Sequence, residues 1–551
     1  MSAPRQIPAE TIRRQGLASD PACSAWVSAN AGSGKTHVLS QRVVRLLLDN
    51  VEPSKILCLT YTRAAAANMA NRVFRDLSAW SLMDDAALGA RIAELTGRPA
   101  DAARLALARR LFARALETPG GLKIQTIHAF CEAVLQQFPL EANIAGHFEM
   151  LDAEMEAALV AEARRDMISG AAGGENVGLA DAFADVLQRG GEAGLDDLLA
   201  EIVAKRDGLR RFIDAIGGGA PPWAALGEAF GLAPGETAAS LSAAAWPLPG
   251  FDEPYVAQLG RAVEGIAAAR FANDVVPFLR EAFAETDPVR RLDLACKGLL
   301  TSKGELYGPS ALTKALVARL PDLPERYGAA ASAAIAAKDR IALAAMLAAT
   351  GSALTLADWL IGRYERLKSA RGFLDFNDLI DRTVRLLARD EASAWVQYKL
   401  DRGIDHILID EAQDTSPDQW QVVKKLAAEF FTGQGARDRV HRTIFAVGDE
   451  KQSIYSFQGA EPAAFSETRL EFRSRIAGAR GAFEEVRLLQ SFRSTREVLS
   501  AVDLVFAAEE RRQGLTRDPE PIVHEGIRDA EPGYVELWSS LGPVEAEEPD
   551  D

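Results

Sequence analysis

The sequence predicts an α/β protein in which a parallel β-sheet, covered by helices on both faces, is interrupted by a large all-helical segment. Short apolar runs alternate with helical patterns before residue 150 and again after residue 400, whereas the residues between have helical spacing throughout. Each apolar run ends in a polar or glycine-rich segment, as strands of a buried parallel sheet do at the edge where ligands bind.

The strands are expected at five apolar runs of strand length, which are Ala25–Ala29, Lys55–Thr62, Leu122–Thr126, His406–Ile409 and Thr443–Gly448. Continuous apolar runs are typical of strands that are buried on both faces. The helical segment separates the third run from the fourth. We therefore expect a discontinuous sheet domain built from residues 1–145 and 370–482.

Residues 146–369 are expected to form the helical insertion, because stretches such as Glu154–Arg165 and Ala329–Leu347 carry apolar residues at helical spacing. A further unit is expected over 483–551, with a strand at Phe483–Leu489, a helix at Thr495–Ala508 and a strand at Tyr534–Leu537. That unit is too short for a finished domain, so we expect the sequence to be the N-terminal part of a longer protein.

The composition is that of a globular protein with an acidic balance. Its 551 residues include 62 Lys and Arg against 78 Asp and Glu, a net charge of −16, so any nucleic-acid site must be local. No CxxC pair suggests a zinc site or a disulfide scaffold. The apolar run 329–337 is cut by Lys338 before it reaches membrane-spanning length, and no leader peptide is recognisable, so a cytoplasmic location is expected.

A glycine-rich loop follows the first strand and precedes a helix at His37–Leu48. Its residues are Ala29, Asn30, Ala31, Gly32, Ser33, Gly34, Lys35 and Thr36. In this context backbone N–H groups and the helix N-terminus bind phosphate oxygens, Lys35 neutralises the β and γ phosphates, and the Thr36 hydroxyl coordinates Mg²⁺. The loop therefore predicts a P-loop for Mg-ATP. The alternative is a glycine-rich turn that only caps the helix.

Two carboxylates follow the fourth strand. Asp410 is expected to reach the Mg²⁺ ion, and the adjacent Glu411 is expected to act as general base on the attacking water. Acidic residues after a strand can also be the start of a solvated loop. Their occurrence together with the P-loop favours the catalytic interpretation.

The motifs together resemble superfamily 1 DNA helicases of the UvrD/RecB kind, and within them the AddA family of bacterial double-strand-break repair, in its alphaproteobacterial form. The resemblance is carried by SAWVSANAGSGKTHVL at 24–39, ILCLTYTRAAAANMANRV at 56–73, GLKIQTIHAFCEAVLQQFP at 121–139, DEAQD at 410–414 and GDEKQSIYSFQGA at 448–460. It implies a RecA-like sheet domain, a helical insertion and the start of a second RecA-like domain, conventionally domains 1A, 1B and 2A.

The resemblance also implies roles for single residues in the ATP site. Gln15 matches the glutamine that reads adenine, although it can also be an ordinary exposed glutamine. Gln452 would sense the γ-phosphate and couple it to DNA. Arg493 would reach the γ-phosphate from the second motor domain, and its alternative is a surface salt bridge.

DNA contacts are implied at three strand ends, where hydroxyls and a cation suit phosphates and aromatic rings stack on bases. These residues are Thr60, Tyr61, Thr62, Arg63, Thr126, His128, Tyr455 and Phe457. Tyr61 and Phe457 can instead be core aromatics, and His128 can be a buried histidine. Gln458 stands where the family usually has arginine, so the chain departs from the family at a phosphate or interdomain contact.

The function implied is that of an ATP-dependent 3′ to 5′ DNA helicase acting on DNA ends in recombination, with an AddB-type partner subunit. We find no motif V, no motif VI and no nuclease domain in the sequence. The alternative is therefore a half-motor that binds nucleotide and DNA without efficient helicase activity. A small-molecule kinase would explain the P-loop but not the TIHAFC, DEAQD and GDEKQSIY segments.

Overall fold

The computed structural model describes residues 7–174, 176–216, 224–233, 235–266, 268, 270–388, 395–396, 399–400, 403–431, 440–515, 522–528 and 531–539. The chain divides into two units, Met1–Met150 with Leu374–Asp551, and Leu151–Phe373. The second unit is the helical one, and its bounds lie a few residues beyond the 146–369 expected. Parts of the further unit expected over 483–551, namely 516–521, 529–530 and 540–551, lie outside the described residues.

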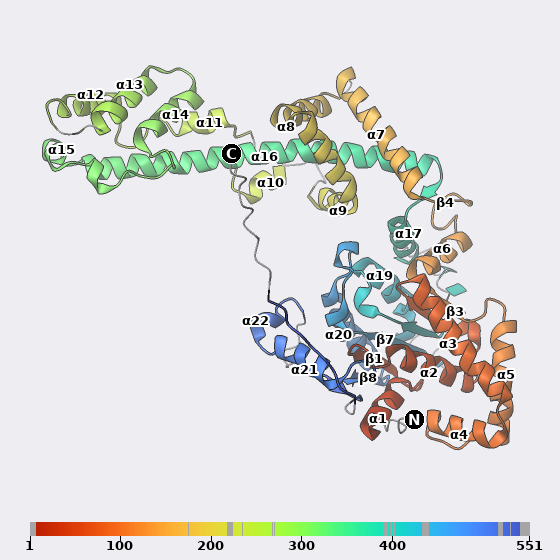
Figure 1. The fold of residues 1–551 in the computed structure, drawn as a ribbon. Helices are drawn as coiled ribbons and strands as arrows, with labels where there is room; N and C mark the ends of the chain where they lie inside the picture. Colours follow the sequence, from red (N-terminus) through yellow and green to blue (C-terminus); the bar gives the residue numbers. More distant parts are fainter. Residues whose placement is uncertain are drawn as a thin grey trace, which may run out of the picture. The chain divides into compact units, whose positions relative to one another are not determined.

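The first unit is built on a six-stranded sheet with strand order β3-β2-β6-β7-β1-β8 (Figure 1). Its strands are β1 (Ser24–Ala29), β2 (Ile56–Thr60), β3 (Lys123–Thr126), β6 (His406–Ile409), β7 (Thr443–Gly448) and β8 (Phe483–Leu488). Every neighbouring pair is parallel. The predicted parallel α/β fold is confirmed, and all five expected strands form.

Helices cover both faces of this sheet because alternate strand residues point to opposite sides. In β2, Leu57 and Leu59 belong to one hydrophobic core, whereas Ile56 and Cys58 belong to the other. The helices of this unit are α1 (Ala9–Ala18), α2 (Lys35–Leu48), α3 (Arg63–Leu82), α4 (Asp85–Thr96), α5 (Ala102–Glu117), α6 (Ile127–Gln137), α17 (Phe376–Ala388), α19 (Pro417–Leu426), α20 (Pro462–Gly478), α21 (Arg496–Val505) and α22 (Glu509–Arg512).

The strand register brings the carboxyl ends together. Ser28 of β1 pairs with Gly448 of β7, Thr60 of β2 pairs with Thr126 of β3, and Leu59 pairs with Ile409 of β6. The segments that follow these strands therefore leave the sheet at one edge, which is where open parallel sheets bind ligands.

Two expectations about the C-terminal segment are wrong. Residues 483–488 do not start a separate unit, because β8 pairs along its whole length with β1 and completes the first sheet. Tyr534–Leu537 is not a strand; it has no regular secondary structure and no strand partner in the described part of the chain. The short strands that do occur are β4 (Glu149–Met150), β5 (Phe373–Leu374), β9 (Gln490–Ser491) and β10 (Glu525–Gly526), of which β9 and β10 pair in parallel.

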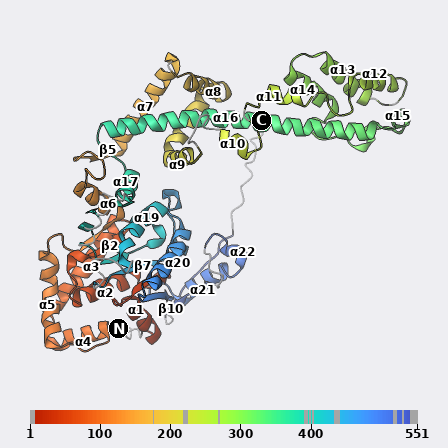
Figure 2. The same cartoon turned by 180° about the vertical axis from the view of Figure 1, so that it is seen from behind.

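The helical unit is organised along α16 (Leu323–Ala370), which is 48 residues long (Figure 2). Its N-terminal part joins a core with α12 (Glu253–Ala262), α13 (Val276–Ala284) and α14 (Pro288–Leu299), and its C-terminal part joins a core with α7 (Ala153–Gly173), α8 (Val177–Ala204) and α9 (Arg206–Ile216). The shorter helices are α10 (Ala224–Ala229), α11 (Ala238–Ala244) and α15 (Lys314–Arg319).

The same α16 is the one helix in the described residues long and apolar enough to cross a membrane, with a mean hydropathy of 1.6 over an 18-residue window that is 28% buried. The run 329–337 considered from the sequence is not the longest uncharged stretch of this helix, because 341–357 is longer. Length and composition are weak evidence for a membrane span. Both ends of α16 pack in protein cores, and the Arg363 guanidinium pairs with Asp166 of α7 at 2.7 Å.

Candidate functional site

The glycine-rich loop occupies the edge of the sheet between β1 and α2. Gly32 and Gly34 have φ angles of +72° and +89°, a region that residues with a Cβ rarely adopt. Gly34 is the N-cap of α2 and supplies no side-chain acceptor, so the first N–H groups of the helix point to the loop without a capping partner. This is the arrangement of a phosphate-binding helix N-terminus.

Lys35 meets Glu411 across the sheet. Its Nζ lies 2.7 Å from the Glu411 Oε2 atom; the Lys35 side chain is 10% exposed and that of Glu411 is 35% exposed. Glu411 adopts a left-handed backbone conformation with φ of +48°, which costs on the order of 1–3 kcal/mol and is typical of functional sites. The structure therefore brings the predicted phosphate-binding lysine and the predicted general base into contact.

Asp410 lies beside this pair at the end of β6. Burial, together with the negative charge of Glu411, raises the pKa of the Asp410 carboxyl to about 6. The buried carboxylate therefore carries a charge that is poorly compensated by the protein alone. Among the described residues, no group of three or more His, Cys, Asp or Glu side chains could by itself hold a metal ion.

Arg493 lies directly against the P-loop, 461 positions after Gly32. A Cβ atom placed on Gly32 would stand only 2.6 Å from the Arg493 Cβ atom, and the Phe492 N–H donates to the Gly32 carbonyl at 2.8 Å. Only glycine permits this approach at position 32. The structure thus places Arg493 beside the loop, and its expected contact with the γ-phosphate stays a prediction.

Three side chains surround Gly34 on the other side of the loop. A Cβ placed there would lie 3.6 Å from the Gln15 amide nitrogen, 3.7 Å from the Cβ of His37 and 4.0 Å from the Phe492 ring. Sequence reasoning identified Gln15 but missed His37 and Phe492. The sequence feature that could have identified them is adjacency to a motif residue: His37 follows Thr36, and Phe492 precedes Arg493.

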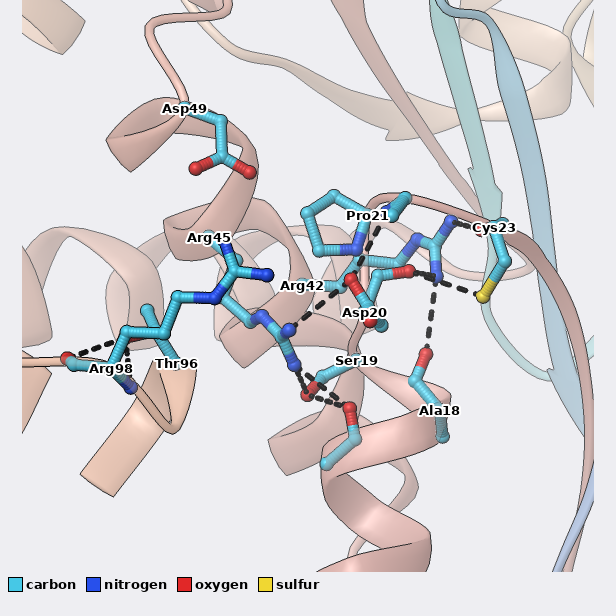
Figure 3. Close-up of polar contacts among 12 residues, drawn as sticks. Ala18, Ser19, Asp20, Pro21, Cys23, Arg42, Arg45, Asp49, Thr96 and Arg98 are labelled. Atoms are coloured by element: carbon cyan, nitrogen blue, oxygen red, sulfur yellow. Dashed lines mark hydrogen bonds and ion pairs between the residues drawn. The ribbon is translucent and has the colours of Figure 1, made fainter. Parts of the chain in front are cut away.

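The helix that carries Gln15 is fixed to α2 by two arginines (Figure 3). The fully buried Arg42 donates to the backbone carbonyls of Ala18 at 3.2 Å and Asp20 at 2.7 Å and also to that of Cys23. Arg45 donates to the Gly16 carbonyl at 2.8 Å. These guanidinium groups donate to carbonyls at the C-terminal end of α1 and in the segment that follows it.

Gln452 is connected to the Lys35–Glu411 pair by a chain of hydrogen bonds. Its side-chain nitrogen donates to the Asp449 carboxylate, and the backbone N–H of Asp449 donates to Gln413 Oε1 at 2.9 Å. Gln413 in turn donates to Glu411 at 3.0 Å. Gln452 is therefore linked to Glu411 through two intervening residues.

Aromatic rings from two strand ends form a short row. The Tyr61 and Tyr455 ring centroids lie 4.7 Å apart, and Phe457 follows at 6.0 Å from Tyr455. Phe457 is 77% exposed, so it is not a core aromatic. Rings with open faces in a row can stack on successive flat bases.

The remaining residues expected to contact DNA differ in how they are placed. The Thr60 hydroxyl donates to the Thr62 carbonyl inside the protein, and the Thr126 hydroxyl caps α6 at the Ala129 N–H. Thr62 is exposed and caps α3, and Arg63 is exposed beside it. His128 is half-buried, and burial lowers its pKa, so the ring is neutral at pH 7.

His128 has an aromatic neighbour that sequence reasoning missed. The ring of Phe376, at the start of α17, meets the His128 ring edge-on at 5.3 Å. Phe376 is 54% exposed. No motif in the sequence pointed to it, because it lies 248 positions away from His128 in the chain.

Comparison with known proteins assigns the family. The UvrD/REP helicase N-terminal domain matches residues 10–184 and 329–473. The chain belongs to the UvrD/REP helicase family. The RecA-like P-loop fold predicted for the sheet domain is the fold of this UvrD helicase domain.

Relatives of this UvrD/REP family chain are named as the A-type subunits of ATP-dependent helicase/nucleases. The protein from Pelotomaculum thermopropionicum is 27% identical over 517 residues, and the one from Desulforudis audaxviator is 29% identical over 515 residues; these matches cover 87% of this chain and 37% and 38% of the relatives. The protein from Desulfitobacterium hafniense is 25% identical over 600 residues, covering 99% and 39%. The chain thus spans under two-fifths of their length.

Proposed function

We propose that this chain is the ATP-binding motor part of a DNA helicase that moves 3′ to 5′ on single-stranded DNA in double-strand-break repair. The contact between Lys35 and Glu411 carries the proposal. It joins a P-loop lysine to a carboxylate suited to activating water, at the carboxyl edge of a RecA-like sheet. The UvrD/REP family supports the helicase class. The 3′ to 5′ direction rests on the resemblance to UvrD and RecB.

ATP would bind with its phosphates on the N–H groups of residues 31–36. Lys35 and Arg493 would then place two cations on the phosphate oxygens, where they offset the charge that develops during transfer. The adenine would lie by Gln15, whose amide has both a donor and an acceptor, with the ring of Phe492 close by. The His37 ring contacts Arg72 instead: its Nδ1 atom lies 2.8 Å from the Arg72 guanidinium, and burial lowers the pKa of the ring.

The residues present fit a magnesium ion. Mg²⁺ takes hard oxygen ligands and usually completes its shell with substrate phosphates and water rather than with a protein cage. Asp410 offers one buried carboxylate with uncompensated charge, and the Thr36 hydroxyl offers a second oxygen. Mg²⁺ bound there would supply charge neutralisation for the phosphates.

Hydrolysis would begin when Lys35 turns from Glu411 toward the phosphates, which frees the carboxylate to accept a proton from water. Gln452 would be positioned by its hydrogen bond to Asp449.

Single-stranded DNA would lie on the row of Tyr61, Tyr455 and Phe457. Arg63 and Thr62 would be available for phosphates, with Phe376 beside His128. Stacking on aromatic rings is indifferent to sequence, as a translocating motor requires.

The partners and the location are part of the same proposal. The relatives are named as subunits, so we propose that this chain also works beside an AddB-type subunit, on DNA ends and in the cytoplasm. The net charge of −16 limits DNA binding to the local site.

The experiment is unwinding of a labelled duplex that carries either a 3′ or a 5′ single-stranded tail, with Mg-ATP. We expect the 3′-tailed duplex to be opened, because loading on that tail gives 3′ to 5′ movement toward the duplex. Lys35→Ala should abolish opening, and Lys303→Ala, an exposed lysine of the helical unit, should not. Opening of only the 5′-tailed duplex would overturn the direction.

The second candidate is a half-motor that binds nucleotide and DNA without opening duplexes. It uses the same two features, the Lys35–Glu411 pair and the row of Tyr61, Tyr455 and Phe457. Tight binding of Mg-ATP and of single-stranded DNA, without opening of either tailed duplex, would support this candidate over the first.

A further inference from the structure

Gln413 lies almost completely buried two residues after Glu411. Its amide nitrogen donates to Glu411 Oε2 at 3.0 Å and to Asp414 Oδ2 at 3.1 Å, and its Oε1 accepts from the Asp449 N–H at 2.9 Å. Two acceptors face the nitrogen and one donor faces the oxygen. Only an amide matches this set, so the orientation of the side chain is fixed.

Gly448, the last residue of β7, makes room for this amide. A Cβ atom on Gly448 would stand 2.7 Å from Gln413 Oε1 and 3.1 Å from its backbone nitrogen. Gly448 does not have a positive φ angle, so its lack of a side chain serves close packing rather than backbone geometry. The end of β7 is thus shaped to receive Gln413.

On one side, Gln413 reaches the groups proposed to act on ATP. Glu411 is bonded to Lys35 at 2.7 Å. Asp449 pairs with the Lys451 ammonium at 2.8 Å and accepts from the Gln452 side chain. A movement of Glu411 when nucleotide binds would therefore be transmitted, through the hydrogen bonds of Gln413 and Asp449, to the segment that carries Gln452.

On the other side, Gln413 reaches the aromatic row. Asp414, which is 6% exposed, accepts from the Gln413 amide. Burial, followed by the negative charge of Asp414, raises the pKa of the Tyr61 hydroxyl. Tyr61 in turn packs against Tyr455 at 4.7 Å.

We propose that Gln413 is a positioning residue that couples the nucleotide site to the DNA-contact row, through Glu411 and Asp449 on one side and Asp414 and Tyr61 on the other. The inference rests on the proposed function and adds the physical route between its two sites. The one amide is bonded to two acceptors and one donor, so a shift of the Glu411 carboxylate toward the attacking water must move or break the bonds to Asp414 and Asp449.

The test is a thermodynamic linkage measurement on the full 551-residue chain. The dissociation constant of a fluorescent oligo-dT strand is measured with and without a non-hydrolysable Mg-ATP analogue. In the wild type, the analogue should change this constant by about fivefold or more, a typical coupling between linked sites. In Gln413→Leu, which fills the space and removes all three bonds, the change should fall below about twofold.

The matched control is Gln419→Leu, which removes another buried glutamine amide, the one that caps α19 through Ser416. It should retain the wild-type coupling; equal loss in Gln419→Leu would show that general loosening is the cause and would overturn the proposal. Asp414→Asn is the second variant, which keeps an acceptor for Gln413 but removes the charge facing Tyr61. Full coupling in folded Asp414→Asn would show the route to be wrong.

The outcomes separate this inference from the proposed function. A wild-type chain that binds the analogue and oligo-dT independently overturns the coupling while the proposed function stands. A wild-type chain that binds neither probe contradicts the proposed function, and the inference falls with it. Coupling lost in Gln413→Leu and kept in Gln419→Leu supports both.

Discussion

Lys35 and Glu411 are separated by 376 positions in the chain, yet their charged atoms lie 2.7 Å apart. The contact exists because β1 and β6 end at the same edge of one parallel sheet, with β7 between them. Glu411 reaches Lys35 from a strained left-handed conformation, which indicates that its direction matters more than the local backbone energy. The pair explains why a discontinuous sheet domain forms one site.

Gly32→Ala should disrupt the ATP site. The new methyl group would collide with Arg493 and would also force a Cβ into a positive φ angle. We expect at least about a tenfold loss of Mg-ATP affinity, measured by isothermal titration; this corresponds to about 1.4 kcal/mol. Gly97→Ala is the matched control, because it has a similar φ of +68° with no atom within 4 Å of the new methyl. Equal ATP affinity in both variants would contradict the close approach of Arg493.

Arg45→Ala should loosen the helix that carries Gln15. Loss of the bond to the Gly16 carbonyl leaves the C-terminal end of α1 less fixed on α2. We expect the KM for ATP to rise several-fold and the preference for ATP over GTP to fall, with little change in kcat. The control is Arg104→Ala, which removes an ion pair with Asp49 on α2's C-cap and leaves α1 untouched. Unchanged base preference in Arg45→Ala would argue against Gln15 as the adenine-reading residue.

Phe457→Ala should weaken binding of single-stranded DNA. Removing one stacking ring costs about 1–3 kcal/mol, which is roughly fivefold to 150-fold in the dissociation constant. Fluorescence anisotropy with oligo-dT measures the effect. Phe230→Ala, an exposed phenylalanine of the helical unit, is the control and should bind as the wild type does. Equal affinity in Phe457→Ala would remove the aromatic row from the DNA site.

Acid should destabilise the sheet domain through His406. Burial, with Arg42 and His441 nearby, lowers the pKa of this histidine to about 3. Because its pKa in the unfolded chain is about 6.5, the unfolded state binds the proton first, and stability is lost as pH falls from 6.5 toward 3. The contribution is at most ~1.4 kcal/mol per pH unit.

His406→Gln is the variant that isolates this effect. Glutamine can still bond to the Thr443 hydroxyl, which lies 2.8 Å from the His406 Nδ1 atom, but it does not titrate. Urea unfolding between pH 7 and pH 5 should give a shallower loss of stability in His406→Gln than in the wild type. Parallel pH curves for the two proteins would show that His406 is not responsible.

Much of the fold and site could be predicted because the signals are local. Continuous apolar runs indicated the strands, and the GSGKT turn between a strand and a helix indicated the P-loop. The sheet position of β8 was missed because its sequence, FEEVRL, alternates like an exposed strand, and pairing with β1 depends on the whole sheet. Arg42 was also missed, because it belongs to no sequence motif. Its burial is explained only by the backbone carbonyls to which its guanidinium donates in the structure.

Internal hydrogen bonds distinguish some of the residues expected to contact DNA, and these contacts stay predictions. Thr60 and Thr126 stand at strand ends as the motif pattern requires, but their hydroxyls are used to terminate a strand and to cap a helix. Phe376 was not predicted, because it lies in an ordinary helical pattern. Only the structure shows its contact with His128. Residue type and spacing locate an edge of the sheet, whereas the direction of each side chain depends on packing.

The most direct test of the central claim is steady-state ATP hydrolysis with and without single-stranded DNA, for the wild type, Lys35→Ala and Glu411→Gln. Because Glu411 is the only proposed base and Lys35 the main phosphate ligand, DNA should stimulate hydrolysis in the wild type, and either substitution should abolish it. Lys303→Ala should behave as the wild type. Hydrolysis that persists unchanged in both Lys35→Ala and Glu411→Gln would contradict the assignment of the site.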